Sequence, residues 1–212
     1  MAKKRDIDPG LQYLRDINFQ RIRGHYGLYD SWTRMFGKTK ADQLFAQRGK
    51  IPDGSAEFYE FKNSDPDISR SISEAYDSEI LRSACNYVYS QKEKFGRRIL
   101  EVGCEAGYMT GFLARTFPEA HIVAIDRCEA AAKIAKSRLE PTGIDNVEFR
   151  ACSLADVTEK FDTVFCIRTI QENLNYDDAP FNGDPLIYQF FCLCSTDRIL
   201  YGFAHFVIKR KW

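Results

Sequence analysis

The spacing of hydrophobic residues along the chain changes character near residue 96. Before that point apolar positions recur at helical intervals, and after it short apolar runs alternate with helical stretches. Alternation of this kind is typical of βαβ units, in which right-handed crossovers place helices on both faces of a mainly parallel sheet. We therefore expect a helical N-terminal cap over residues 1–95 and a doubly wound α/β domain over residues 96–212.

The N-terminal part is predicted to be helical except for one loop. The spacing of its apolar residues favours helices over four stretches, namely 11–22, 32–36, 41–48 and 74–94. Residues 50–66 contain two prolines and a glycine, which favours a loop. This loop is unusually aromatic because it contains Phe58, Tyr59 and Phe61.

The C-terminal part is predicted to contain several short strands and helices. The strands are expected at 98–102, 121–126, 147–151, 163–167 and 199–208. The helices are expected at 108–117, 129–139 and 186–194. A parallel strand left at the edge of the sheet exposes unpaired backbone groups, so we expect a protein partner, a second copy of the chain or the N-terminal part to cover that edge.

A glycine-containing loop, Glu101-Val102-Gly103-Cys104-Glu105-Ala106-Gly107, follows the first predicted strand and begins a helix. Glycine lets the backbone approach a ligand closely, and the free N–H groups at the start of a helix can receive a carboxylate. A dinucleotide-binding loop would need glycine where Glu105 and Tyr108 stand. The loop therefore fits a pyrophosphate poorly, and a nicotinamide cofactor is disfavoured.

An acidic residue, Asp126, ends the second predicted strand. A carboxylate there can accept both hydroxyls of a ribose in the crevice at the carboxyl ends of the strands. Arg127 follows and could lie over the edge of an adenine. The third strand leads to Ser153 and Leu154, where a hydroxyl and a backbone N–H could meet the adenine.

With this loop, the spaced acid and the fourth strand together, residues 98–173 resemble the class I S-adenosylmethionine-dependent methyltransferase family, which has a Rossmann-like α/β fold. The resemblance implies S-adenosyl-L-methionine as the cofactor. It also implies a set of cofactor-binding residues: Glu101, Gly103, Cys104, Gly107, Asp126, Arg127, Ser153, Leu154 and Ile167.

The chain departs from the family's pattern at three places. Glu105 stands where the family usually has glycine, and Ser153 stands where it often has an acid. The first change narrows the pocket or redirects the loop, and the second weakens the contact with the adenine amino group. The family's sheet usually ends in an antiparallel pair of strands, and we expect the last two strands to be missing here.

Methyl transfer from a sulfonium is an in-line displacement in which the protein mainly positions the acceptor. In the loop after the fourth strand, Glu172 could orient or deprotonate the acceptor and Arg168 could hold an anionic substrate; a solvated helix start is the alternative for both. In this family N-terminal helices commonly cap the cofactor. We therefore predict a lid over residues 58–76 that includes Tyr59, Phe61 and Tyr76, with ordinary core packing as the alternative for each.

Composition and charge narrow the classes of function. Lys and Arg together number 30, as do Asp and Glu, so the formal charge is zero and the basic excess of a nucleic-acid binder is absent. The start of the chain lacks the apolar stretch of a signal peptide, and no run reaches the roughly 18 apolar residues of a membrane span. We expect a cytoplasmic protein with reduced cysteines that binds no membrane and no metal.

These observations predict an S-adenosylmethionine-dependent methyltransferase that acts on a small-molecule acceptor. The absence of an Asn-Pro-Pro-Tyr or Asp-Pro-Pro-Tyr sequence after the fourth strand argues against amide or adenine nitrogens as acceptors. Two alternatives stay open. One is a non-catalytic module that binds S-adenosylmethionine or S-adenosylhomocysteine and works through a partner. The other is a methyltransferase for protein or RNA, which would use the basic residues near the two ends of the sequence.

Overall fold

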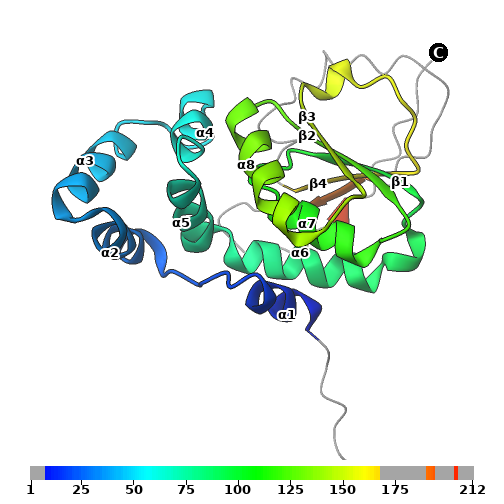
Figure 1. Cartoon of the computed structure of the whole chain (residues 1–212), viewed down its shortest axis with the longest axis horizontal. Coiled ribbons are helices and arrows are strands. Elements are labelled where there is room, and N and C mark those ends of the chain that lie inside the picture. Colours follow the sequence, from blue (N-terminus) through cyan, green and yellow to red (C-terminus); the bar gives the residue numbers. More distant parts are fainter. Residues whose placement is uncertain (1–7, 168–189, 194–202, 205–212) are drawn as a thin grey trace, which may run out of the picture. The chain divides into compact units, whose positions relative to one another are not determined.

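The computed structural model describes residues 8–167, 190–193 and 203–204. The chain divides into two compact units, Met1–Lys92 and Glu93–Trp212, whose helices and strands are labelled in Figure 1. That the first unit acts as a cap and the second as a cofactor domain stays a prediction. In the described part of the chain, no helix combines the length and the apolar character needed to cross a bilayer.

The described residues of the first unit form helices joined by short loops, without strands. Its helices are α1 (Pro9–Asp16), α2 (Gly24–Phe36), α3 (Lys38–Arg48), α4 (Ala56–Lys62), α5 (Pro66–Tyr76) and α6 (Ser78–Ser90). Three of them begin at a side chain that accepts a hydrogen bond from a backbone N–H in the first turn, because short polar residues satisfy these free donors. The caps are Asp8 for α1, Ser55 for α4 and Asp65 for α5.

Three expectations for this unit are wrong. The helix predicted over 11–22 ends at Asp16, because Asn18 takes a left-handed conformation with φ of 51° that a helix cannot continue. The loop predicted over 50–66 contains α4, whose start is fixed by the Ser55 cap. The single helix predicted over 74–94 is α5 followed by α6, with a break at Asp77.

The core of the first unit is built around Trp32, whose side chain is completely buried. Its indole Nε1 donates to the Ser71 hydroxyl at 2.7 Å, so the buried polar atom of the ring is satisfied. The rings of Phe45 and Phe61 meet it edge-on at centroid distances of 5.2 and 6.2 Å. A buried aromatic cluster of this kind joins α2 and α3 to α4 and α5.

The second unit contains one sheet with the strand order β3-β2-β1-β4-β5-β6. The strands are β1 (Arg98–Val102), β2 (His121–Asp126), β3 (Val147–Ala151), β4 (Thr163–Ile167), β5 (Phe190–Leu193) and β6 (Phe203–Ala204). The first five run parallel and β6 pairs antiparallel with β5. The helices α7 (Tyr108–Thr116) and α8 (Glu129–Leu139) form the connections from β1 to β2 and from β2 to β3.

The central strands are buried on both faces, as expected of a parallel sheet that helices cover. Every residue between the ends of β1, β2 and β4 is buried. One apolar cluster joins them through Leu100, Val123 and Val164. The fold class expected from the sequence, a Rossmann-like and mainly parallel α/β sheet, is confirmed by this topology.

One expectation at the C-terminal end of the sheet is wrong. The helix predicted over 186–194 is the strand β5, which lies beside β4 in register with Phe165 opposite Phe191. A short apolar run does not distinguish a buried strand from a buried helix by its periodicity. The strand predicted over 199–208 is represented in the described residues by β6, which pairs with β5 as a sixth strand. Whether a partner chain or a second copy binds this sheet stays a prediction.

Candidate functional site

The loop between β1 and α7 forms a tight turn at the carboxyl ends of β1 and β2. The N–H groups of Gly103 and Cys104 both donate to the Ile125 carbonyl, at 2.8 and 2.9 Å. Gly103 has φ of 76°, a left-handed conformation that glycine adopts without strain. These bonds bring the turn to the end of β2, where the sequence places its acid.

Gly107 has a packing reason of its own. It also has φ of 76°, and a Cβ at this position would lie only 2.8 Å from the Cβ of Ala135 on α8. Glycine therefore allows α7 to begin against α8, independently of any contact with a ligand.

Asp126 connects the turn to the end of β2. Its Oδ2 accepts the N–H of Glu105 and its Oδ1 accepts the N–H of Cys128, both at 2.8 Å. The side chain is half-buried. A carboxylate oxygen has more than one acceptor position, so it can accept hydrogen bonds from more than one donor. Glu105 takes φ of 46° in making this contact, a left-handed conformation that is unusual for a residue with a side chain.

Glu101 is a buried carboxyl group beneath the turn. It is 2% exposed, and its Oε2 has no hydrogen-bond partner in the described part of the structure. Burial raises the pKa of Glu101 to about 8; the Thr110 hydroxyl lowers it and the charge of Asp126 raises it further. A buried polar atom without a partner is rare in proteins and indicates a missing ligand or water.

The end of β3 lies beside the end of β2, because the Cys152 N–H donates to the Asp126 carbonyl at 3.0 Å. Ser153 follows and forms a capping box with Asp156: its hydroxyl accepts from the Ala155 N–H at 3.3 Å, and its N–H donates to the Asp156 carboxylate at 2.9 Å. The Ser153 hydroxyl therefore has a local role, although its proton remains available. Leu154 packs against the apolar cluster of the sheet.

The structure brings most of the predicted cofactor residues to one edge of the sheet. The register pairs Val102 with Ile125 and with Cys166, and pairs Asp126 with Ala151, so the carboxyl ends of β1 to β4 coincide. Arg127 is exposed there, and Ile167 ends β4 half-buried. Glu172 and Arg168, the predicted acceptor-positioning residues, lie outside the described residues.

The three predicted lid residues belong to the first unit and have different environments. Phe61 is buried against Trp32, as its alternative interpretation of ordinary core packing expects. Tyr59 lies edge-on to the ring of Phe58 at 5.3 Å, and Tyr76 is 44% exposed. A lid role for these residues stays a prediction.

The sequence analysis missed some participants at the turn. Thr110 on α7 is buried, and its hydroxyl lowers the pKa of Glu101. Its place as the third residue of the helix that follows the glycine loop could have identified it as a candidate. The Glu105 and Cys128 N–H groups bind Asp126 through the backbone, which leaves no signature in residue type. Within the described ranges no group of His, Cys, Asp or Glu gathers in the manner of metal ligands, and the expectation that the protein binds no metal stays a prediction.

Comparison with known proteins relates this site to one family. Residues 93–189 match a family model described as a methyltransferase domain. The malonyl-acyl-carrier-protein O-methyltransferase of Bacillus anthracis is 38% identical over 76 residues, which are 35% of this chain and 27% of that protein. The ubiquinone biosynthesis O-methyltransferase of Xanthomonas euvesicatoria is 32% identical over 89 residues, 40% of this chain and 36% of that protein.

A solved structure shows a similar but distant relation. The SAM-dependent O-methyltransferase of Thermotoga maritima is 22% identical, with a TM-score of 0.43, and the alignment covers 54% of this chain and 44% of that one. The chain spans 27% and 36% of the length of the two curated relatives above. The likeness is therefore one between domains.

Proposed function

We propose that the protein transfers a methyl group from S-adenosylmethionine to a small-molecule acceptor, because residues 93–189 match a methyltransferase domain. The observation that carries the proposal is the turn at Gly103, which hydrogen bonds hold against Ile125 and Asp126 at the carboxyl ends of β1 and β2. Ligands of open α/β sheets bind outside these strand ends.

The buried carboxyl group of Glu101 supports the fit of this cofactor. Its Oε2 has no hydrogen-bond partner among the described residues, and the α-ammonium of a methionine moiety is a donor that would complete it. Asp126 would accept the ribose hydroxyls beside the two backbone N–H groups that it binds, because a carboxylate oxygen can accept more than one hydrogen bond. Ser153, Leu154 and Arg127 would border the adenine.

When bound, S-adenosylmethionine supplies the electrophilic methyl group on a sulfonium, and this chain's residues position the reactants. Holding the acceptor in line with the methyl group converts a bimolecular step into an effectively unimolecular one. Glu172 and Arg168 are our proposed positioning residues for the acceptor. Both curated relatives are O-methyltransferases, so an oxygen is the acceptor atom to test first.

Calorimetric titration of the full chain with S-adenosylmethionine tests the cofactor assignment. We expect Asp126→Ala to weaken binding by about 1–3 kcal/mol, because it removes charge-assisted hydrogen bonds. Asp145→Ala is the matched control, since Asp145 is an exposed acid just before β3 and its loss should leave the affinity unchanged. Unchanged affinity in Asp126→Ala, at wild-type thermal stability, would remove Asp126 from the site.

Turnover separates the enzyme from the binding module. We expect labelled methyl groups from the cofactor to appear in a small molecule when the protein is incubated with a metabolite extract. Tight cofactor binding without any methylated product would favour the non-catalytic module. Label recovered in protein or RNA would favour the macromolecular acceptor.

We also propose a cytoplasmic location. Five cysteines of the described residues, Cys85, Cys104, Cys128, Cys152 and Cys166, form no disulfide. Free thiols persist in reducing compartments and pair in oxidising ones. Cell fractionation with thiol labelling tests this, and disulfide-bonded protein in an extracytoplasmic fraction would contradict it.

A further inference from the structure

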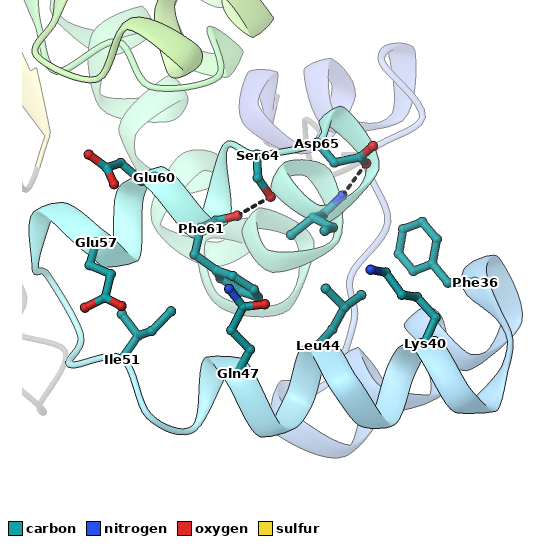
Figure 2. Close-up of a pocket in the computed structure, with 11 residues that line it drawn as sticks. Phe36, Lys40, Leu44, Gln47, Ile51, Glu57, Glu60, Phe61, Ser64 and Asp65 are labelled. Atoms are coloured by element: carbon teal, nitrogen blue, oxygen red, sulfur yellow. Dashed lines mark hydrogen bonds between the residues drawn. The ribbon is translucent and has the colours of Figure 1, made fainter.

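The first unit contains a cavity among its own helices. Its volume is about 590 Å³, and α3, α4 and α5 contribute most of its lining (Figure 2). Ligand pockets in proteins commonly fall in the range of about 300–1,000 Å³. The apolar part of the wall is formed by the buried side chains of Leu44, Ile51, Phe61 and Ile68.

The helices on either side of the cavity are held in place by other contacts. The chain between α3 and α4 is fixed by Arg48, whose guanidinium donates to the Ile51 carbonyl at 3.1 Å and pairs with Asp53. Ser55 then begins α4 by accepting the Phe58 N–H at 3.0 Å. These contacts keep the connection between the two helices in place, so the cavity is a defined feature of the unit.

The rim of the cavity carries more negative than positive charge. Glu57 and Glu60 lie three residues apart on α4, on one face of the helix, and both are exposed. Neither of their side chains makes a hydrogen bond or an ion pair with another described residue. Asp65 is also on the rim, but it accepts the N–H groups of Asp67 and Ile68 at the start of α5.

One cation faces these acids among the described lining residues. Lys40 on α3 lines the cavity near Phe36, while Glu57 lies at the opposite end near Ile51 and the Glu60 carboxylate points outward from the rim (Figure 2). Three carboxylates against one ammonium give the rim a net negative charge. The two acids without partners, Glu57 and Glu60, are the ones that a ligand would neutralise.

We propose that this cavity binds a small amphipathic cation. The protonated amine of the ligand donates hydrogen bonds to the Glu57 carboxylate, Glu60 adds negative charge to the same rim, and the apolar body of the ligand covers Leu44, Ile51 and Phe61. Charge-assisted hydrogen bonds select the head group, and burial of apolar surface supplies affinity. An anionic ligand of the same shape meets repulsion at the same rim. The proposal does not depend on the methyltransferase assignment.

Three octyl compounds that differ only in their head group test the proposal on the full chain: octylammonium, octanol and octanoate. Trp32 reports binding by fluorescence, because its ring contacts Phe61, which lines the cavity. The centroids of these two rings are 6.2 Å apart. The other tryptophan, Trp212, is removed by Trp212→Phe. We expect octylammonium to bind at least about tenfold more tightly than octanoate. The difference should shrink as salt screens the exposed carboxylates.

A pair of variants assigns the selectivity to the two acids. Glu57→Gln combined with Glu60→Gln should lower the affinity for octylammonium about tenfold, to that of octanol, and leave octanol binding unchanged. Glu119→Gln is the matched control, because Glu119 is an exposed glutamate in the second unit. Equal affinity for the three compounds would overturn the proposal. The same holds for an unchanged octylammonium affinity in the double variant, an equal loss in the control, or no saturable signal at millimolar concentration.

Discussion

The two units of the molecule place their carboxylates in opposite settings. In the second unit Glu101 is buried beneath a backbone turn, and Asp126 accepts two backbone N–H groups that hold the turn together. In the first unit Glu57 and Glu60 stand exposed on one face of α4 beside an apolar cavity. A buried charge is costly unless it is paired, whereas an exposed one costs little.

This difference separates two ways to build a site. The second unit constrains its ligand through the fold, because a change at the turn also disturbs the backbone that Asp126 holds. In the first unit Glu57 and Glu60 hold no backbone group in place, so they can change with little effect on folding. Substitutions at the turn should therefore alter stability strongly, whereas substitutions of Glu57 and Glu60 should mainly alter ligand choice.

The largest effect is expected from Glu101→Gln at alkaline pH. The folded-state pKa of Glu101 is raised to about 8 from 4.5, because burial disfavours the charged form. Protonated Glu101 therefore contributes fully below pH 4.5, and its contribution is lost as the pH rises to about 8. Over this window the wild type should lose on the order of 4 kcal/mol of unfolding free energy that the variant does not lose.

Urea unfolding of both proteins between pH 5 and pH 9 measures this difference, in the absence of cofactor. Parallel pH profiles for wild type and variant would show that Glu101 ionises at an ordinary pKa and is not buried as described. In that case Glu101 would not differ in its setting from the exposed carboxylates of the first unit.

A smaller effect is expected from Gly107→Ala. The new Cβ would lie 2.8 Å from the Cβ of Ala135, and φ of 76° strains any residue with a side chain. Left-handed strain and overpacking together should cost about 3 kcal/mol. Gly143→Ala is the control, because Gly143 has a similar φ of 72° but no atom within 4 Å of the new Cβ. The control should cost about 1 kcal/mol by urea unfolding. Equal costs would show that α7 and α8 do not approach closely here.

The sequence predicted the second unit better than the first for a physical reason. The strands β1, β2 and β4 are mainly apolar runs, and β3 alternates apolar and charged residues, so their bounds could be predicted from the sequence. The strand β5 was missed because the run Phe-Phe-Cys-Leu at 190–193 also suits a buried helix. In the first unit the short helix α4 depends on one cap, Ser55, inside a segment whose composition favours a loop.

The candidate site was predictable in position but not in detail. Carboxyl ends of parallel strands meet at one edge, so the proximity of Gly103 and Asp126 follows from the order of the elements. The burial of Glu101 and the contact of Gly107 with Ala135 depend on how α7 and α8 pack on the sheet. Side-chain type alone carries no information about such distances. The cavity of the first unit could not be predicted from the sequence for the same reason.

The smallest effect on stability is expected from substitution of Glu57 and Glu60 in the first unit. Glu57→Gln with Glu60→Gln should change the free energy of unfolding by less than about 0.5 kcal/mol. Losing an acid from the first turn of α4 is slightly unfavourable, and removing like charges three residues apart is slightly favourable, so the two effects oppose each other.

Lys62→Gln on the same helix gives the contrast. Lys62 is 4% exposed and pairs with Asp77 at 3.1 Å, so its loss leaves a charge without its partner and should cost about 3 kcal/mol or more. Urea unfolding of the two variants compares a buried and an exposed charge on one helix. If the double glutamine variant lost as much stability as Lys62→Gln, Glu57 and Glu60 would be structural residues. The cavity rim would then resemble the turn at Asp126, and the distinction between the two units would disappear.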